Sequence, residues 1–226
     1  MKLGFVPRLV GLGLVAICLL SPRVGRSQAE ISPDEAKEGF QLLFNGKDLS
    51  GFTEVQGRPG AFTVKDGVLS GTREGMKAYW LSTDKKYSDF ELRLDYMLTP
   101  NGNSGIFIRV PHHRPRTSNV GMEIQLLDDG SKEGVPTSKD TGAIYRVAAA
   151  KKFVSKPAHQ WNNLIVRCEG DRIQVTLNGE LINDFDMSSD PQTKSRPREG
   201  FIGLSAHTDI VQFRNIRIKE LKPSRS

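Results

Sequence analysis

Cysteine is scarce in this chain of 226 residues, which contains only Cys18 and Cys168. Cys18 lies in the one long apolar run, LVGLGLVAICLL (residues 9–20), so no internal disulfide can form once that run is removed. Cys168 alternates with Leu164 and Val166 in LIVRC, and we expect it to be a small core side chain. A hydrophobic core must therefore hold the fold together.

The apolar run is too short for a membrane span, which needs about 20 residues. It follows MKLGFVPRL, which carries two cations and no acid, and precedes the small residues of Ser27-Gln28-Ala29. This pattern is typical of a secretory signal peptide over residues 1–29, with a mature start near Glu30. We therefore expect a periplasmic or secreted protein, with no stable membrane anchor and a single domain over residues 30–226.

The positive charge of the chain belongs mostly to this leader. Residues 1–29 hold Lys2, Arg8, Arg23, Arg26 and no acid, so their removal lowers the formal net charge from +6 to +2. No stripe of Lys and Arg interleaved with aromatic residues is present, which argues against nucleic acid as a partner. The G-x-G-x-x-G pattern of dinucleotide-binding folds is also missing.

The remaining sequence consists of short runs of alternating apolar and polar residues separated by turn residues. Asp66-Gly67 and Asn178-Gly179 favour type I′ hairpin turns, because both dipeptides tolerate positive φ angles. No long segment has helical periodicity, and the pattern predicts an all-β sandwich or jelly roll. The expected strands and hairpins cover residues 61–71, 89–98, 104–110, 121–129, 143–147, 162–168, 172–184, 201–206 and 211–221.

Strand alternation also predicts which polar side chains point away from the core. In GMEIQLLDD (residues 121–129), Met122, Ile124 and Leu126 share one face, while Glu123 and Gln125 share the other. The same alternation applies to residues 104–110 and 89–98. The outward set expected from the three strands is Arg93, Asp95, Arg109, Glu123 and Gln125.

Several stretches together resemble a known family. LLFNGKDLSGF, KDGVLSG, NSGIFIR, GMEIQLLDD, TGAIYRV, WNNLIVRCEGDRIQVTLNGEL and FRNIRIKEL, in this order over residues 38–222, are similar to the 3-keto-disaccharide hydrolase family. The resemblance implies a concanavalin-like jelly-roll β-sandwich with a concave sugar-binding sheet. It also implies action on glycosides whose ring carbon 3 is a ketone, and some relatives are lyases or hydratases of such sugars.

A ketone at carbon 3 acidifies the hydrogen at carbon 2, so that a base can start β-elimination of the group at carbon 1. This route needs a base, donors for the enolate oxygen and an acid for the leaving group. A retaining glycosidase needs two carboxyl groups instead, and the alternate partner of Glu123 is the amide Gln125. We predict Glu123 as general base or acid, with Arg109 and Gln125 as substrate-binding partners. The alternative is a Glu123–Arg109 ion pair on a solvated face.

Four further residues are candidates that the sequence leaves open. His207 could donate the proton to the leaving oxygen, although Ser205-Ala206 stands before it where the family often has Gln-Asp or Gln-Asn. Asp128 is either catalytic or, with Asp129, a turn residue. Asn103 either binds the substrate or belongs to a turn at the start of a strand. Tyr145 either binds the substrate or is a packed residue of a strand.

Cofactors and rival functions also stay open. A divalent cation is possible, but Asp128 and Asp129 would supply only part of the six or more oxygens of a Ca²⁺ shell. Tyr79 and Trp80 could stack on a sugar, although such residues more often pack in a core. His112-His113-Arg114 is expected to be a solvated basic loop. The rival functions are a non-catalytic carbohydrate-binding module and a conventional glucanase, whose second carboxylate would be Asp95 or Asp128.

Overall fold

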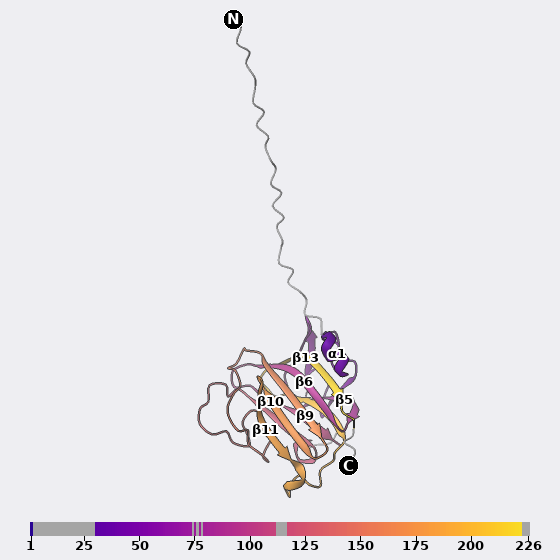
Figure 1. Cartoon of the computed structure of the whole chain (residues 1–226), viewed down its shortest axis with the longest axis vertical. Helices are drawn as coiled ribbons and strands as arrows, with labels where there is room; N and C mark the ends of the chain where they lie inside the picture. Colours follow the sequence, from indigo (N-terminus) through magenta and orange to yellow (C-terminus); the bar gives the residue numbers. More distant parts are fainter. Residues whose placement is uncertain (2–29, 74, 76, 78, 112–116, 223–226) are drawn as a thin grey trace.

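The computed structural model describes residues 30–222, apart from 74, 76, 78 and 112–116, together with residue 1 (Figure 1). The expected signal peptide and the expected basic loop at residues 112–114 therefore lie outside the described residues. Within the described part, no helix combines the length and apolar character that a membrane crossing requires.

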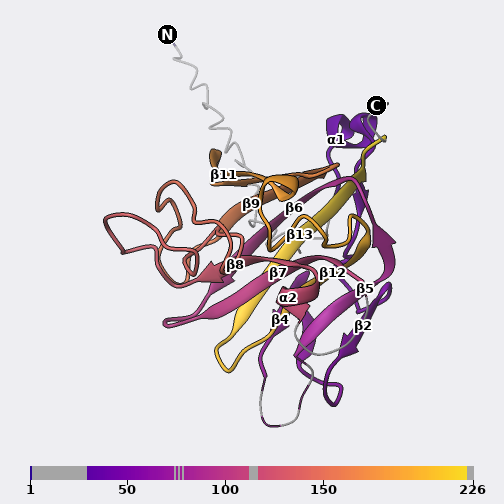
Figure 2. The ribbon, with the colours of Figure 1, turned by 90° about the horizontal axis from the view of Figure 1, so that it is seen from below.

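The architecture is a sandwich of two antiparallel sheets (Figure 2). An eight-stranded sheet has the order β11-β10-β9-β6-β13-β4-β3, with β1 also paired to β13, and a five-stranded sheet has the order β2-β5-β12-β7-β8. The elements are α1 (Pro33–Glu38), β1 (Gln41–Leu42), β2 (Phe52–Val55), β3 (Phe62–Lys65), β4 (Val68–Gly71), β5 (Trp80–Tyr87), β6 (Phe90–Leu98), β7 (Asn103–Val110), α2 (Thr117–Val120), β8 (Met122–Leu127), β9 (Asn162–Glu169), β10 (Arg172–Leu177), β11 (Glu180–Asp186), the 3-10 helix η1 (Met187–Ser189), β12 (Gly200–Ser205) and β13 (Val211–Glu220).

Both predicted hairpin turns are confirmed. Asp66 and Gly67 have φ angles of 51° and 80° and connect the paired strands β3 and β4. Asn178 and Gly179, at 51° and 87°, connect β10 and β11 in the same way. Positive φ at both central positions is the requirement of a type I′ turn, whose twist matches that of the flanking strands.

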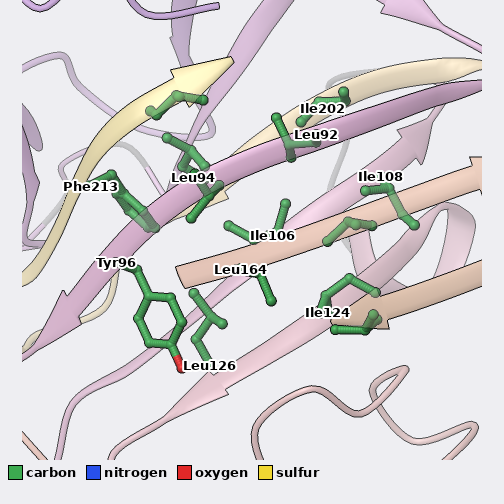
Figure 3. Close-up of a cluster of buried hydrophobic side chains, with 14 of the residues drawn as sticks. Leu92, Leu94, Tyr96, Ile106, Ile108, Ile124, Leu126, Leu164, Ile202 and Phe213 are labelled. Carbon is green, nitrogen blue, oxygen red and sulfur yellow. The ribbon is translucent and has the colours of Figure 1, made fainter. Parts of the chain in front are cut away.

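The core lies between the two sheets, where the apolar faces of the strands meet (Figure 3). Leu92, Leu94 and Tyr96 on β6 share this core with Ile106 on β7 and Ile124 on β8. Burial of each such aliphatic side chain contributes about 1.5–3 kcal/mol. Cys168 is also fully buried, as predicted, and burial raises the pKa of its thiol to about 12, which makes it a poor nucleophile.

The sequence did not predict β1, β2 or β5, and it predicted one strand that does not form. Strand β5 runs between β2 and β12, but its Trp80 to Thr83 stretch is buried at every position, so it lacks the alternation that identifies a half-exposed strand. Residues 143–147 do not form a strand, because Ile144 makes only isolated bridges, to Ile124 and Ala148. This segment instead follows the edge of β8 through hydrogen bonds such as Gln125 N to Ala143 O at 3.0 Å.

The expected grouping of outward side chains was also wrong for β6. This strand pairs with β9 and β13 in the eight-stranded sheet, whereas β7 and β8 pair in the other sheet. Arg93 accordingly pairs with Glu91 at 2.7 Å and with Glu35 of α1 at 3.1 Å. Asp95 accepts hydrogen bonds from Asn163 and Asn215. Both residues therefore lie on a different sheet from Glu123.

Candidate active site

The outer face of the five-stranded sheet carries Glu123 and Gln125, as the alternation in β8 predicted. Met122, Ile124 and Leu126 of the same strand belong to the core. Glu123 and Gln125 are nevertheless only 7% and 5% exposed. A carboxylate withdrawn from water to this extent needs hydrogen bonds or opposite charge around it. The interpretation of Glu123 as half of a solvated ion pair was therefore wrong.

The Glu123 side chain crosses from β8 onto the neighbouring strand β7 at Gly105. In the β7–β8 register, Gly105 is opposite Gln125 and Phe107 is opposite Glu123. A Cβ atom added to Gly105 would lie 2.9 Å from Glu123 Cγ and 3.0 Å from Cδ, with Oε1 closer still. Glycine is thus the residue that lets the carboxyl group lie flat on the backbone of β7.

Aromatic side chains surround the same face. The Tyr79 ring is 5.4 Å from the His207 ring, at an interplanar angle of 72°, and 6.1 Å from the Phe107 ring. The Arg73 guanidinium lies 5.4 Å from the Tyr79 centroid, a cation–π distance. Trp80 is fully buried and meets Phe107 edge to face at 5.6 Å. Trp80 therefore packs within this face, whereas Tyr79 is the centre of the partly exposed group.

The environment shifts two pKa values in opposite directions. Burial, reinforced by the negative charge of Glu123, raises the pKa of Tyr79. Burial also lowers the pKa of His207, and the Arg73 charge lowers it further, although Asp209 opposes this shift. Near neutral pH the site thus offers a protonated phenol close to the Glu123 carboxyl group, and a predominantly neutral imidazole that packs against the phenol ring.

Three other predicted residues come together with Glu123. Gln125 Nε2 donates to Asn103 Oδ1 at 2.9 Å, across the β7–β8 pair. The Tyr145 backbone N–H donates to the Glu123 carbonyl oxygen at 2.9 Å, so the segment along the edge of β8 brings Tyr145 to the site. Gln125, Asn103 and Tyr145 are therefore close neighbours of Glu123.

Arg109 does not belong to this group, and its predicted outward orientation was wrong. Arg109 has a φ of 53°, and β7 has one extra residue opposite Phe201 and Gly203 of β12, which is a β-bulge. The bulge shifts the alternation, so Val110 joins Phe107 in the outer-face cluster and Arg109 is fully buried.

The Arg109 guanidinium is instead bound by the turns that precede β6 and β10. It donates to Ser88 O at 3.0 Å and Gly170 O at 2.8 Å, and it pairs with Asp89 at 3.1 Å. These are structural contacts between the two sheets. They leave no donor of Arg109 directed at the face that carries Glu123.

Asp128 and Asp129 occupy turn positions. Asp128 Oδ2 accepts from the Asn101 backbone N–H at 2.9 Å, and Asp128 follows Glu123 by five residues, or about 16 Å of extended strand. Asp129 is fully buried and accepts from Thr141 and Ser155. Across residues 30–222, leaving aside those not described, no group of three or more His, Cys, Asp or Glu side chains could hold a metal ion.

Residues 39–219 match the family model of the 3-keto-alpha-glucoside-1,2-lyase-like domain. The chain belongs to this family. A 3-keto-disaccharide hydrolase of Bacteroides thetaiotaomicron is 24% identical over 230 residues, which cover 81% of this chain and 79% of the relative. A crystal structure from Parabacteroides distasonis, of a protein assigned as a glycosyl hydrolase, is 27% identical with a TM-score of 0.75, covering 86% of this chain and all of that one.

Similarity to more distant structures identifies the fold alone. The β-glucanase of Bacillus licheniformis is 11% identical with a TM-score of 0.52, over 81% of this chain and 99% of the glucanase. The predicted concanavalin-like jelly roll is thereby confirmed. Family membership supports a glycoside hydrolase-like enzyme that acts on carbohydrate.

Arg73 is the site residue that sequence reasoning missed. It lies in TREGMKAYW, a stretch without helical or strand periodicity, and no motif marks it. Its contact with Tyr79 and its backbone hydrogen bond from Arg73 N to His207 O join the segment after β4 to the segments before β5 and after β12. No local pattern carries that information.

Proposed function

We propose that this protein cleaves 3-keto-glycosides by elimination followed by hydration, with Glu123 as the general base. The observation that carries the proposal is the buried carboxyl group of Glu123, which lies over Gly105 on the face of the Gln125 amide and close to the Tyr79 phenol. The lyase-like family and the 3-keto-disaccharide hydrolase relative support the substrate class.

The positions of the other acids favour elimination over a retaining mechanism. A retaining glycosidase needs two carboxyl groups about 5 Å apart. Gln125 takes the alternate position on β8, Asp95 lies on the other sheet and Asp128 caps a turn. Elimination requires one base together with hydrogen-bond donors, which the described residues of this face supply.

The proposed chemistry balances in two stages. Glu123 takes the proton from carbon 2 and the electron pair moves into the enolate of the carbon 3 ketone. The bond from carbon 1 to the leaving oxygen then breaks, and that oxygen takes the proton from the Glu123 carboxyl group while His207 donates a hydrogen bond to it. Water next adds to carbon 1 and a proton returns to carbon 2, which completes a net hydrolysis. We assign the Tyr79 hydroxyl to the enolate oxygen, His207 to the leaving oxygen, and Gln125 with Asn103 to sugar hydroxyls.

Proton NMR in deuterated water tests the reaction. A 3-keto-disaccharide and its unoxidised parent are incubated with the purified protein, with and without a divalent cation, beside an enzyme-free blank. We expect loss of the keto compound alone, with deuterium at carbon 2 of the released sugar beyond the level of the blank. Product that retains hydrogen at carbon 2 would indicate direct hydrolysis. Sugar affinity without any product would instead indicate a carbohydrate-binding module.

A matched pair of carboxyl-to-amide variants tests the assignment of the base. Glu123→Gln should abolish turnover while sugar binding and the thermal transition are retained, because the amide cannot accept the proton. Asp128→Asn changes a carboxyl group that lies just beyond the other end of β8 and caps a turn. Full activity in Glu123→Gln, or a selective loss in Asp128→Asn, would remove Glu123 from this role.

We also propose that the protein is exported after cleavage near Ala29. The basis is the charged start, the short apolar run and the small residues before Glu30. Intact mass measurement on protein recovered from the periplasm or medium should give the mass of residues 30–226. A cytoplasmic product of full mass would contradict this proposal.

A further inference from the structure

Ser205, the last residue of β12, carries a buried hydroxyl group that is not satisfied. The residue is fully buried, and Oγ has no hydrogen-bond partner among the residues that the structure describes. The Ser205 backbone oxygen, in contrast, accepts from Ser104 Oγ at 2.9 Å. An unsatisfied buried polar atom destabilises a fold and is rare in native proteins, so the Ser205 hydroxyl calls for a functional explanation.

The pairing of β12 places this hydroxyl beside Glu123. Leu204 pairs with Ile106 of β7, and both belong to the core, so the next position sets Ser205 opposite Gly105 on the outer face. On its other side Ser205 pairs with Trp80 of β5. Cβ positions of directly opposed residues lie about 4.5–5.5 Å apart.

Gly105 is also where the Glu123 carboxyl group lies. A Cβ on Gly105 would be 3.0 Å from Glu123 Cδ, so the carboxyl group occupies the space that a side chain there would fill. No Gly105 side chain therefore stands between Ser205 and Glu123. Among the residues that the structure describes, the charged or titratable groups in this part of the face include Tyr79, Tyr145, Arg73, His207 and Asp209.

We propose that Ser205 is a positioning residue for Glu123, whose hydroxyl donates to the Glu123 carboxylate and holds it over Gly105. Rotation about the Ser205 Cα–Cβ bond between staggered rotamers directs Oγ toward the carboxylate. A hydroxyl bond to an ionised carboxylate is stronger than one between neutral groups. The inference rests on the proposed role of Glu123 as the base, and it adds a residue that holds this base in place.

A pair of serine-to-alanine variants separates positioning from simple packing. Ser205→Ala removes the hydroxyl that donates to Glu123, so kcat should fall about tenfold with little change in KM, while the urea midpoint falls no further than in Ser104→Ala, which also loses one buried hydrogen bond. Ser104→Ala, on the neighbouring strand, removes a satisfied buried hydroxyl and should lower the midpoint while kcat is retained. A Ser205→Ala protein with wild-type kcat would overturn the inference.

A second measurement needs no substrate. Carbon-13 NMR of labelled glutamate side chains follows the titration of Glu123, whose signal is assigned by its loss in Glu123→Gln. Because hydroxyl donation favours the carboxylate, Glu123 should titrate at higher pH in Ser205→Ala than in the wild type. Identical titrations would overturn the inference. Failure of the wild type to turn over any keto sugar would refute the proposed function but leave this titration difference intact.

Discussion

The carboxyl group of Glu123 rests on the backbone of Gly105, a residue of the neighbouring strand. The space that a Cβ at Gly105 would need lies 2.9 Å from Glu123 Cγ. This contact lets a side chain that starts on β8 present its carboxyl group over β7, next to β12. The position of the proposed base thus depends on the absence of a single methyl group.

We therefore expect Gly105→Ala to displace the carboxyl group and lower kcat by about a hundredfold, the size of effect that a 1 Å misplacement can have. Overpacking should also cost about 1–3 kcal/mol of unfolding free energy. Steady-state kinetics and urea unfolding measure the two effects.

Gly71→Ala is the matched control, because the heavy atoms nearest to its Cβ would belong to Phe62, at 2.7 Å, and to Val211, both in the eight-stranded sheet. It should lose stability and keep kcat. Equal activity losses in the two variants would show that Gly105 acts through stability alone.

Arg109→Met should destabilise the fold by about 3–5 kcal/mol, because it leaves Asp89 without its buried partner and removes the donors to Ser88 O and Gly170 O. Urea unfolding measures this loss, and KM of the folded variant should be unchanged. Arg172→Ala removes an exposed pair with Asp184 and should change stability little. A raised KM with unaltered stability would restore Arg109 as a substrate ligand.

The unfolding free energy should contain a contribution from His207 that depends on pH. Its folded-state pKa is lowered, first by burial and then by Arg73, so the unfolded chain binds the proton more readily. This contribution is complete above the unfolded pKa, about 6.5, and is lost as pH falls through and below that value. Urea titrations at pH 7.5 and 5.5 should show a smaller loss for His207→Gln than for the wild type. Equal losses would place the imidazole in a solvated setting.

Tyr79→Phe should lower kcat by about a hundredfold, the effect of removing one donor to a developing oxyanion. The aromatic contacts with His207 and Phe107 should persist, because the ring is retained. The raised pKa of Tyr79 keeps the phenol protonated through neutral pH, so the wild-type phenol is a donor there. Kinetics at pH 7 provide the measurement.

Tyr87→Phe is the matched control at the far end of β5. Burial also raises the pKa of Tyr87, but its ring packs against Phe90. This variant should keep full activity. Full activity in Tyr79→Phe would assign the enolate donor to another residue.

Alternation and turn chemistry predicted much of this fold because both act over a few neighbouring residues. Asp66-Gly67 and Asn178-Gly179 adopt the φ angles that a tight hairpin needs, whatever the surrounding sheet. The faces of β8 follow from the strand period of two, which placed Glu123 and Gln125 opposite the core. The order of the family motifs indicated the jelly roll.

Long-range pairing decided what the sequence alone could not. The bulge at Arg109 reversed one side chain, and the pairing of β6 with β9 and β13 moved Arg93 and Asp95 to the other sheet. Tyr79, Arg73 and His207 meet because the segments before β5, after β4 and after β12 come together. Local patterns in the sequence were enough to show which residues could face away from the core. Which of these residues meet is a property of the folded chain, because hydrogen bonding between distant strands sets the neighbours of each side chain.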